Sequence, residues 1–288
     1  MTDQRFIKIA VGQTGPVLAN VDKNIEKHCE LIEKAVEQKA DLILFPELSL
    51  SGYSLKDATF DVALKKDDAR LDKIRALSSK ISICCGFAEL GDRHELYNTQ
   101  LFFEDGQLLT RHRKVYLPTY GVFEEGRYFS SGNRFQAFDS KLTRMGILIC
   151  EDIWHLSSGL ILALDGAAVI LVSAAGLTRG TNKDAKPDNI IAWETLVKSI
   201  SISTRSYTIF ANRVGVEDGL VFWGGSEIVE PDGRAIAKAD YYKEQLLVAD
   251  IDMYKLKHAR INTTLLSDEK LPVLIEEFTR LHKKNKEY

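Results

Sequence analysis

Three reactive side chains each stand directly after an apolar run. Glu47 follows LILFP, Lys114 follows LLTRHR, and Cys150 closes GILIC. Reactive groups in open α/β sheets collect beyond the carboxyl ends of the strands, where a rigid scaffold brings distant positions together. A glutamate can accept a thiol proton, a cysteine can attack a carbonyl carbon, and a lysine can stabilise the oxyanion that forms. These residue types together predict acyl transfer through a cysteine nucleophile.

Each of these residues also has an ordinary structural interpretation. A cysteine at a strand end is usually a reduced core thiol. Lys114 belongs to the run RHRK, which is typical of solvated surface, and Glu47 can bind the amides of a following turn. Glu124 and Glu125 can equally be surface carboxylates. The spacing alone therefore leaves catalytic and structural roles both open.

The elements that must position these residues follow from the hydrophobic pattern. Short runs rich in Ile, Val and Leu alternate with segments of helical periodicity, which predicts an α/β protein with strands buried between helices. The expected strands are residues 6–13, 41–45, 81–90, 98–104, 144–150, 167–173, 207–214 and 246–251. Helices are expected within residues 21–40, 71–81, 187–200 and 271–281. Asp-Gly and Gly-Gly pairs between residues 214 and 239 indicate hairpins, so we expect a mixed sheet.

Composition narrows the class of protein. The chain has 288 residues, of which 45% are hydrophobic and 27% charged, and this predicts a soluble globular protein with a sizeable core. Its net charge of −3 disfavours nucleic acid as a partner. The apolar runs are much shorter than the ~20 residues that span a bilayer, and the N-terminus does not resemble a secretory signal. We therefore expect a cytoplasmic protein with no membrane partner.

Several common sites have no support in the sequence. Cys29, Cys84, Cys85 and Cys150 form no CxxC pair, so a disulfide framework is not expected. The histidines are too widely spaced for a short-range zinc pair, and neither GxGxxG nor GxxxxGK[ST] occurs. We expect neither a metal nor a cofactor. No linker or repeat divides the chain, which predicts a single domain over residues 1–288 with a C-terminal tail from about residue 255.

Three blocks of sequence carry a family resemblance. FPELSLSGY surrounds Glu47, RKVYLPTYGVFEEGRYF surrounds Lys114, and GILICEDIW surrounds Cys150. Their order and spacing resemble the signature blocks of the nitrilase superfamily of carbon–nitrogen hydrolases, and the similarity continues through WETLVKSISISTRSYTIFANRVG to FWGGSEIVEPDGRAI. Within the superfamily, LPTYGVFEEGRYF and CEDIW are most similar to the glutaminase domain of glutamine-dependent NAD synthetases.

The resemblance implies an αββα sandwich, a four-layer α/β fold, that acts without a cofactor. It implies that Cys150 is the nucleophile, Glu47 the general base and Lys114 the oxyanion stabiliser, assisted by the backbone N–H of Glu151. Matching FEEGRYF to the family pattern selects Glu125 as a further glutamate, which either holds Lys114 and Glu47 in position or helps to place substrate and water. The reaction implied is cleavage of an amide through a thioester, with release of ammonia. A homodimer or larger oligomer is also expected.

The resemblance also predicts residues around the substrate. Tyr120, Glu151 and Arg179 match positions that hold glutamine in the glutaminase domains, whereas a serine of those domains falls at Ala175, with Ser173 nearby. Because a hydroxyl is missing at Ala175, we expect weak activity on glutamine. The leading hypothesis is an amidase acting on a small linear amide with a polar or carboxylate-bearing tail.

Three other functions stay open from the sequence. The chain can be a glutaminase subunit that passes ammonia to a separate synthetase, a nitrile hydrolase, or a catalytically silent interaction protein. The printed chain ends at Tyr288 and contains no SGGxDS-type pyrophosphate loop, so we expect it not to make NAD alone. The presence of Glu47, Lys114 and Cys150 argues against the silent protein.

Overall fold

The computed structural model describes residues 5–178 and 187–284, which form two six-stranded sheets. The first sheet has the order β14 (Gln245–Asp252), β1 (Phe6–Gln13), β2 (Leu42–Leu44), β3 (Ser82–Leu90), β4 (Leu96–Glu104) and β5 (Gln107–Arg113). The second has the order β13 (Ala235–Lys238), β12 (Glu227–Val229), β9 (Tyr207–Asn212), β8 (Val169–Ala174), β7 (Arg144–Ile149) and β6 (Phe138–Asp139). A separate hairpin joins β10 (Val214–Glu217) to β11 (Leu220–Trp223).

Both sheets are mixed, as the hairpin signals predicted. Strands β1, β2 and β3 run parallel, and so do β7, β8 and β9, while the other pairings are antiparallel. Parallel strands end at the same edge of a sheet. The carboxyl ends of β2, β7 and β8 therefore define where the residues that follow them can meet.

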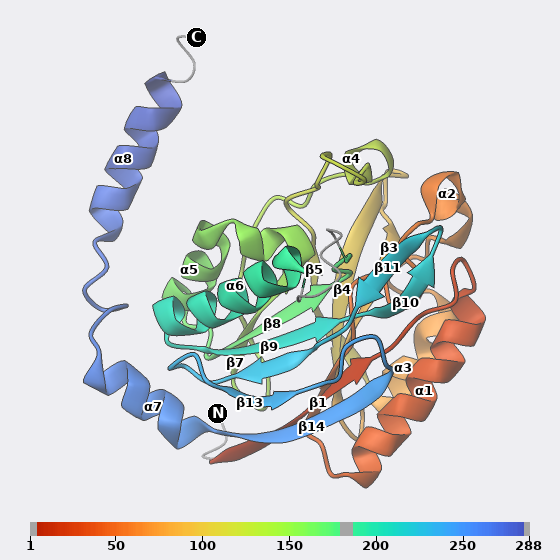
Figure 1. Ribbon diagram of the computed structural model, residues 1–288, viewed down its shortest axis with the longest axis horizontal. Helices are drawn as coiled ribbons and strands as arrows, with labels where there is room; N and C mark the ends of the chain where they lie inside the picture. Colours follow the sequence, from red (N-terminus) through yellow and green to blue (C-terminus); the bar gives the residue numbers. More distant parts are fainter. Residues whose placement is uncertain (1–4, 179–186, 285–288) are drawn as a thin grey trace.

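The layers follow from the apolar faces of the elements. The two sheets pack face to face over a core that includes Ile9 and Leu44 from the first sheet and Leu171 and Ile209 from the second. Helices α1 (Val21–Glu37) and α3 (Asp72–Leu77) cover the outer face of the first sheet, and α5 (Leu156–Leu164) and α6 (Asp188–Thr204) cover that of the second (Figure 1). The predicted αββα sandwich is confirmed.

Short elements complete the described chain. They are the 3-10 turns Lys56–Ala58, Ala69–Leu71 and Cys150–Trp154, and the helices α2 (Thr59–Val62), α4 (Glu125–Tyr128), α7 (Met253–Asn262) and α8 (Leu271–Lys284). All four cysteines are free thiols. Over the described part of the chain, no helix is both long and apolar enough to cross a bilayer.

Helix α1 also anchors the loop that follows β2. Its apolar residues, among them Ile25 and Ile32, face the first sheet, and the Asn20 side chain caps its first turn by accepting from Lys23 N at 3.1 Å. The His28 ring is buried and bonds Ser49 Oγ at 2.9 Å, and burial lowers the pKa of His28 to about 4. A neutral histidine therefore holds the segment that begins at Glu47.

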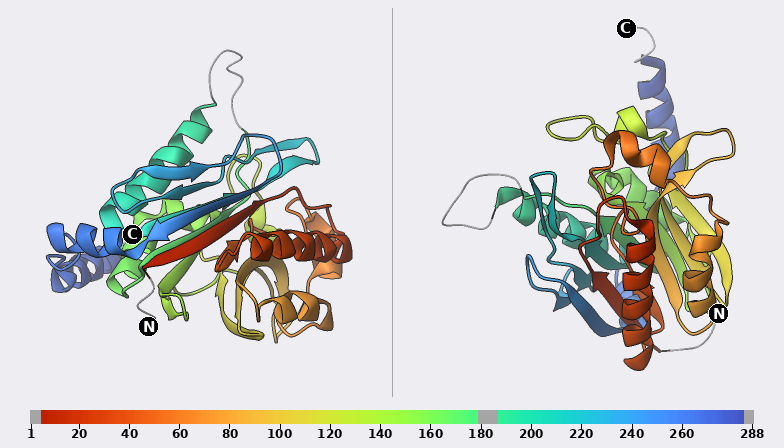
Figure 2. Two further views of the ribbon diagram at one scale, coloured as in Figure 1. Left: turned by 90° about the horizontal axis from the view of Figure 1, so that it is seen from below. Right: turned by 90° about the vertical axis from the view of Figure 1, so that its right-hand side faces the viewer.

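The C-terminal region differs from the rest of the chain in its packing. The tail expected from about residue 255 starts inside α7, where Leu256 still packs into the core between the sheets. Helix α8 leads away from the body of the molecule (Figures 1 and 2). Its apolar face is exposed, with Phe278 59% and Ile275 58% accessible. This helix makes no contribution to the cores just described.

Candidate active site

Glu47 begins the turn that follows β2, where the backbone changes direction sharply. Leu48 has a φ of +48°, and its carbonyl oxygen accepts from Gly52 N at 2.8 Å, which fixes the turn. The Glu47 side chain is fully buried. Its Oε1 accepts from Lys114 Nζ and from Asn98 Nδ2, both at 2.7 Å, and its Oε2 accepts from Ala175 N at 2.8 Å. The two carboxylate oxygens therefore have different surroundings.

Lys114 follows β5 and is also fully buried. Its ammonium contacts a carboxylate oxygen of Glu47 and one of Glu125, each at 2.7 Å. Burial alone would lower the pKa of Lys114, but the facing Glu125 and Glu47 outweigh it and raise that pKa well above its usual value. Lys114 is therefore a permanent cation at the centre of the site.

Glu125 is the first residue of α4. It is buried, whereas its neighbour Glu124 is exposed. Its Oε1 accepts from Tyr53 Oη at 2.6 Å as well as from Lys114. Burial raises the pKa of Glu125 to about 7, against the opposing effect of Lys114. The structure thus brings Glu125, rather than Glu124, to the cation.

Cys150 begins the 3-10 turn that follows β7, and its φ is +47°. A non-glycine residue in this region is strained, and such residues cluster at functional sites. Burial, reinforced by Glu47, raises the pKa of the Cys150 thiol well above its usual value, and Lys114 only partly offsets this. The resting thiol is therefore protonated, so a nucleophilic role requires a base.

Asp152 ties the cysteine turn to the lysine strand, a role that the sequence reasoning missed. Its Oδ1 accepts from Val115 N and Tyr116 N, both at 3.0 Å. Its Oδ2 accepts from Ile149 N at 3.0 Å and lies 2.8 Å from His112 Nε2. Asp152 is fully buried. One carboxylate therefore fixes the backbone on both sides of the reactive centre.

Asn98 and Tyr53 are two further residues that the sequence reasoning did not assign. The Asn98 side-chain amide donates to Glu47, and the Asn98 backbone carbonyl oxygen accepts from Lys114 N at 2.8 Å. Tyr53 donates to Glu125. Tyr53 is the last residue of the block FPELSLSGY, so the family resemblance offers a signal for it. Asn98 lies outside all three blocks, and the sequence offers no such signal for it.

The predicted substrate residues are not all brought together. Tyr120 Oη donates to Glu151 Oε2 at 3.0 Å in an accessible position. Ala175 is buried, and its backbone N–H donates to Glu47 Oε2. Ser173 is fully buried, and its hydroxyl donates to the Phe45 carbonyl oxygen at 2.9 Å, which links β8 to the segment that follows β2. Arg179 lies outside the described residues.

Aromatic side chains surround the approach to Glu125. Tyr53 makes edge contacts with Phe123 and Phe222, whose ring centroids lie at 6.4 and 5.9 Å. A cavity of about 260 Å³ adjoins Glu125 and Tyr53. Among the described residues, no group of three or more His, Cys, Asp or Glu side chains could hold a metal ion.

Comparison with known proteins defines the class. The family model for carbon-nitrogen hydrolases matches residues 8–261, and the chain belongs to this family. It is 30% identical to a nitrilase of Pyrococcus abyssi, over 89% of this chain and 94% of the relative. It is 31% identical to the glutamine-dependent NAD(+) synthetase of Acinetobacter baylyi, over 90% of this chain and 46% of the relative. The chain thus spans about half the length of that synthetase.

Solved structures show the same fold. A carbon-nitrogen hydrolase from Helicobacter pylori is 28% identical, with a TM-score of 0.84 over 93% of this chain and 96% of that one. The glutamine-dependent NAD+ synthetase from Acinetobacter baumannii is 30% identical, with a TM-score of 0.77 over 88% of this chain and 47% of that one. The sequence resemblance to the nitrilase superfamily is therefore confirmed.

Proposed function

We propose that this protein hydrolyses the carbon–nitrogen bond of a small linear amide through a cysteine thioester. The observation that carries the proposal is the buried Lys114 ammonium held between Glu47 and Glu125 near a protonated Cys150 thiol. A fixed cation in a water-poor site stabilises developing negative charge more strongly than it would in water. Glu125 accepts from the Lys114 ammonium and Asn98 donates to the Glu47 carboxylate, so these two residues hold the cation and the base in position.

The proton path follows from the two oxygens of Glu47. Oε1 already accepts from Lys114 and Asn98, whereas Oε2 accepts from the Ala175 N–H alone. Oε2 therefore has the capacity to take the thiol proton. As it does so, sulfur bonds to the amide carbon and the carbonyl oxygen becomes an oxyanion, which Lys114 and the Glu151 N–H stabilise.

The second half of the reaction uses the same carboxyl group. Protonated Glu47 gives its proton to the amide nitrogen, the carbon–nitrogen bond breaks, and ammonia leaves a thioester on Cys150. Glu47 then takes a proton from water as the water oxygen attacks the thioester carbon. The carbon–sulfur bond breaks, the carboxylic acid is released, and the proton returns to sulfur. No step needs a group from outside the chain except water.

Ammonia release from a panel of short amides and nitriles tests the reaction. We expect turnover of at least one amide, with a thioester adduct on the protein visible by intact-mass measurement. Glu47→Gln should lengthen the life of that adduct, because the base for water is missing. Turnover of nitriles but of no amide would overturn the proposal in favour of nitrile hydrolysis.

The polar end of the substrate has a candidate partner in the pair Tyr120–Glu151. Glu151 presents a carboxylate beside the cysteine turn, and Tyr120 orients it by a hydrogen bond. A carboxylate there would attract a positively charged or amide-bearing tail, and Arg179 would meet a carboxylate tail. Because Ala175 offers no hydroxyl, we propose that glutamine is a poor substrate. A kcat/KM for glutamine above that of every other amide would contradict this.

The glutaminase-subunit alternative draws its support from the similarity to NAD synthetases. A subunit of that kind would release little ammonia until a separate synthetase bound it. Glutamine turnover measured with and without a candidate synthetase distinguishes the two functions. Stimulation of tenfold or more by the synthetase would favour the subunit over the free amidase.

We also propose that the protein is a homodimer or larger. Exposed apolar side chains gather on α5, α6 and α8, among them Leu156 at 63%, Ile191 at 50% and Phe278 at 59% accessible. Such faces on a folded chain mark interaction surfaces. Light scattering during size exclusion should give at least twice the 32.4 kDa chain mass. A monomer at micromolar concentration would contradict the proposal.

A further inference from the structure

A second cavity lies beside β5, the last strand of the first sheet, and is separate from the catalytic centre. Its volume is about 500 Å³, and its walls are β5 and the segment that leads into β6. Three of the lining residues are arginines, Arg111, Arg113 and Arg134, and we call this site the arginine cavity. Among the described residues, no carboxylate lines it. Its chemistry is therefore unlike that of the acidic catalytic centre.

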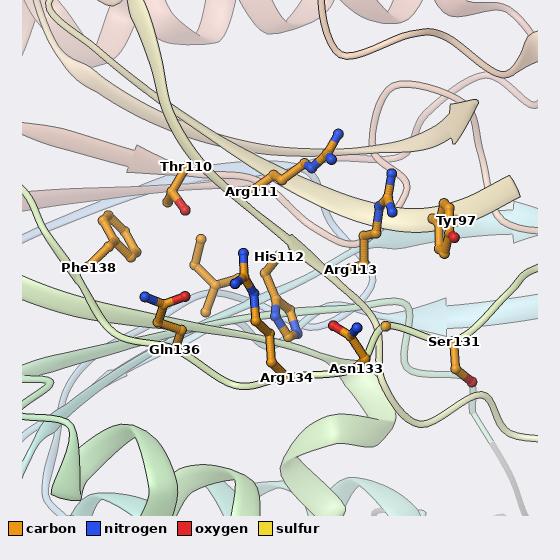
Figure 3. Close-up of a pocket in the computed structure, with 12 residues that line it drawn as sticks. Tyr97, Thr110, Arg111, His112, Arg113, Ser131, Asn133, Arg134, Gln136 and Phe138 are labelled. Carbon is orange, nitrogen blue, oxygen red and sulfur yellow. The ribbon is translucent and has the colours of Figure 1, made fainter. Parts of the chain in front are cut away.

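Two of the three arginines are fixed by one carboxylate. Arg113 donates to Glu89 through Nε at 2.9 Å and Nη2 at 2.8 Å, and Arg111 also pairs with Glu89, which is buried. The Arg113 guanidinium lies 3.6 Å from the centroid of the Tyr97 ring. One negative charge thus compensates two positive charges. Both guanidiniums extend from β5 toward β3 and point away from Arg134 (Figure 3), so they add positive charge beside the cavity but do not face the same ligand position as Arg134.

Arg134 adds a third charge. Over the part of the chain that the structure describes, its guanidinium has no hydrogen-bond or ion-pair partner. Figure 3 shows it extending beside His112, between Gln136 and Asn133. The backbone that carries it is anchored, because Gly132 N donates to the Lys114 carbonyl oxygen at 2.7 Å. The wall is therefore fixed while the cation is available for a ligand.

The cavity also adjoins the elements that hold the catalytic centre. His112 lines the cavity, and its Nε2 lies 2.8 Å from Asp152, the residue that ties the Cys150 turn to the lysine strand. Lys114 comes directly after Arg113. A ligand in the arginine cavity would therefore bind the same strand end that carries the catalytic cation.

We propose that the arginine cavity binds a small organic anion that carries a phosphate or several carboxylates. The Arg134 guanidinium can match the oxygens of a phosphate or carboxylate group in a bidentate manner, and Asn133 and Gln136 beside it add neutral donors. A cavity of this volume accommodates a metabolite-sized ligand. The chain as a whole carries a net charge of −3, so the positive charge is local to this site.

Calorimetric titration of the full chain tests the proposal. Inorganic pyrophosphate and citrate serve as separate probes at matched ionic strength, with sodium chloride as the blank. We expect saturable binding of at least one probe, with about one site per chain. Binding of pyrophosphate alone identifies a phosphate site, and binding of citrate alone identifies a carboxylate site.

Three variants locate the binding. Arg134→Gln removes the unpaired cation, and Gln136→Glu adds a repelling charge to the wall, so each should weaken binding at least tenfold. Arg93→Gln removes an exposed arginine outside the cavity and should leave binding unchanged. All substituted positions are exposed, so thermal melting should show folded proteins. Absence of saturable binding, or equal affinity in Arg134→Gln, Gln136→Glu and the parent, overturns the proposal.

Discussion

The proposed catalytic centre, formed by Glu47, Lys114, Glu125 and Cys150, and the surroundings of the arginine cavity both place cations beside carboxylates, but their charge balance is opposite. In the centre, one ammonium, Lys114, lies between two carboxylates, Glu47 and Glu125, and all three are buried. Beside the arginine cavity, the carboxylate of Glu89 pairs with two guanidiniums, and the guanidinium of Arg134 has no partner among the described residues. The first region is buried and has more carboxylates than cations, whereas the second is accessible and has more cations than carboxylates.

The difference shows how burial decides what a charge can do. A charge removed from water must be paired and hydrogen-bonded, or it costs several kcal/mol. The pairing that meets this cost also fixes Lys114, Glu47 and Glu125 in one geometry, which suits a reaction. Arg134 is exposed to water, so its charge is not desolvated and its N–H groups stay available to a ligand. Substitutions that alter the pairing in one region should therefore leave the other region unaffected.

The largest effect is expected at the nucleophile. Cys150→Ala should abolish ammonia release, because the proposed covalent bond cannot form, while the cavity that binds anions keeps its affinity. Steady-state assays and calorimetry measure the two properties separately. Cys29→Ala, which removes a half-buried thiol on α1, is the matched control and should retain activity. Turnover by Cys150→Ala close to that of the parent would rule out the mechanism.

The next largest effect is expected at the cation. Lys114→Met should lower kcat by on the order of 10²–10³, as for loss of an oxyanion donor. It also leaves Glu47 and Glu125 buried without their counter-charge, which costs about 3–5 kcal/mol of unfolding free energy. Urea denaturation measures this loss.

A double substitution separates charge balance from catalysis. Lys114→Met combined with Glu125→Gln removes one buried carboxylate along with the cation, so it should be more stable than Lys114→Met alone. Its kcat should not recover, because the oxyanion donor is still missing. Recovery of activity together with stability would show that Lys114 serves only to balance charge.

A smaller effect is expected at Asp152, which joins the two regions. Asp152→Asn keeps the size of the side chain but cannot accept from all of Ile149, Val115 and Tyr116, so one buried N–H loses its partner. The expected cost is about 1–3 kcal/mol, together with a fall in kcat that exceeds the change in KM. Glu104→Gln alters another buried carboxylate, which bonds Ser82 and Ser140, and should lower stability with kcat unchanged. A kcat equal to the parent's in Asp152→Asn would refute the positioning role.

The sequence singles out Glu47, Lys114 and Cys150 because each closes an apolar run inside a short block, and the structure brings these three residues together. Contacts between residues of different blocks cannot be predicted from the sequence pattern. Asn98 lies 51 residues from Glu47, and only the pairing of β2, β3 and β4 brings its amide to that carboxylate. Ser173 was placed near the substrate because it is close to Ala175 in the chain. The packing of the two sheets decides what Ser173 contacts, because its hydroxyl donates to the Phe45 carbonyl oxygen on the side of the first sheet.

The arginine cavity was also hidden from the sequence, for a related reason. Strand β5 was not expected, because the segment QLLTRHR lies at a sheet edge, where most of its side chains are only half-buried and polar. The run RHRK was interpreted as solvated surface. Its arginines are instead held by Glu89, which belongs to β3 and lies more than twenty residues away in the chain. A cluster of charged residues in the sequence forms a site only when the fold brings a distant residue, here Glu89, into contact with it.

The smallest expected effect is a change in the pH dependence of stability caused by Glu125. Burial raises the pKa of Glu125 to about 7 in the folded chain, above its ordinary value of 4.5. Between these two pH values the folded state binds more protons than the unfolded state, so this group makes the free energy of unfolding fall as pH rises. Glu125→Gln cannot titrate and should lack this fall.

Comparison of the parent with Glu125→Gln isolates that contribution. His28 acts in the opposite sense, because burial lowers the pKa of His28 to about 4, and its contribution to stability grows as pH rises from about 4 to 6.5. Both chains contain His28, so its effect cancels in the difference between them. Urea denaturation at pH 5, 6, 7 and 8 should show the parent losing stability relative to Glu125→Gln as pH rises. A difference that stays constant over this range would mean that the compensation by Lys114 keeps Glu125 ionised throughout, and that the catalytic centre is balanced by charge pairing alone.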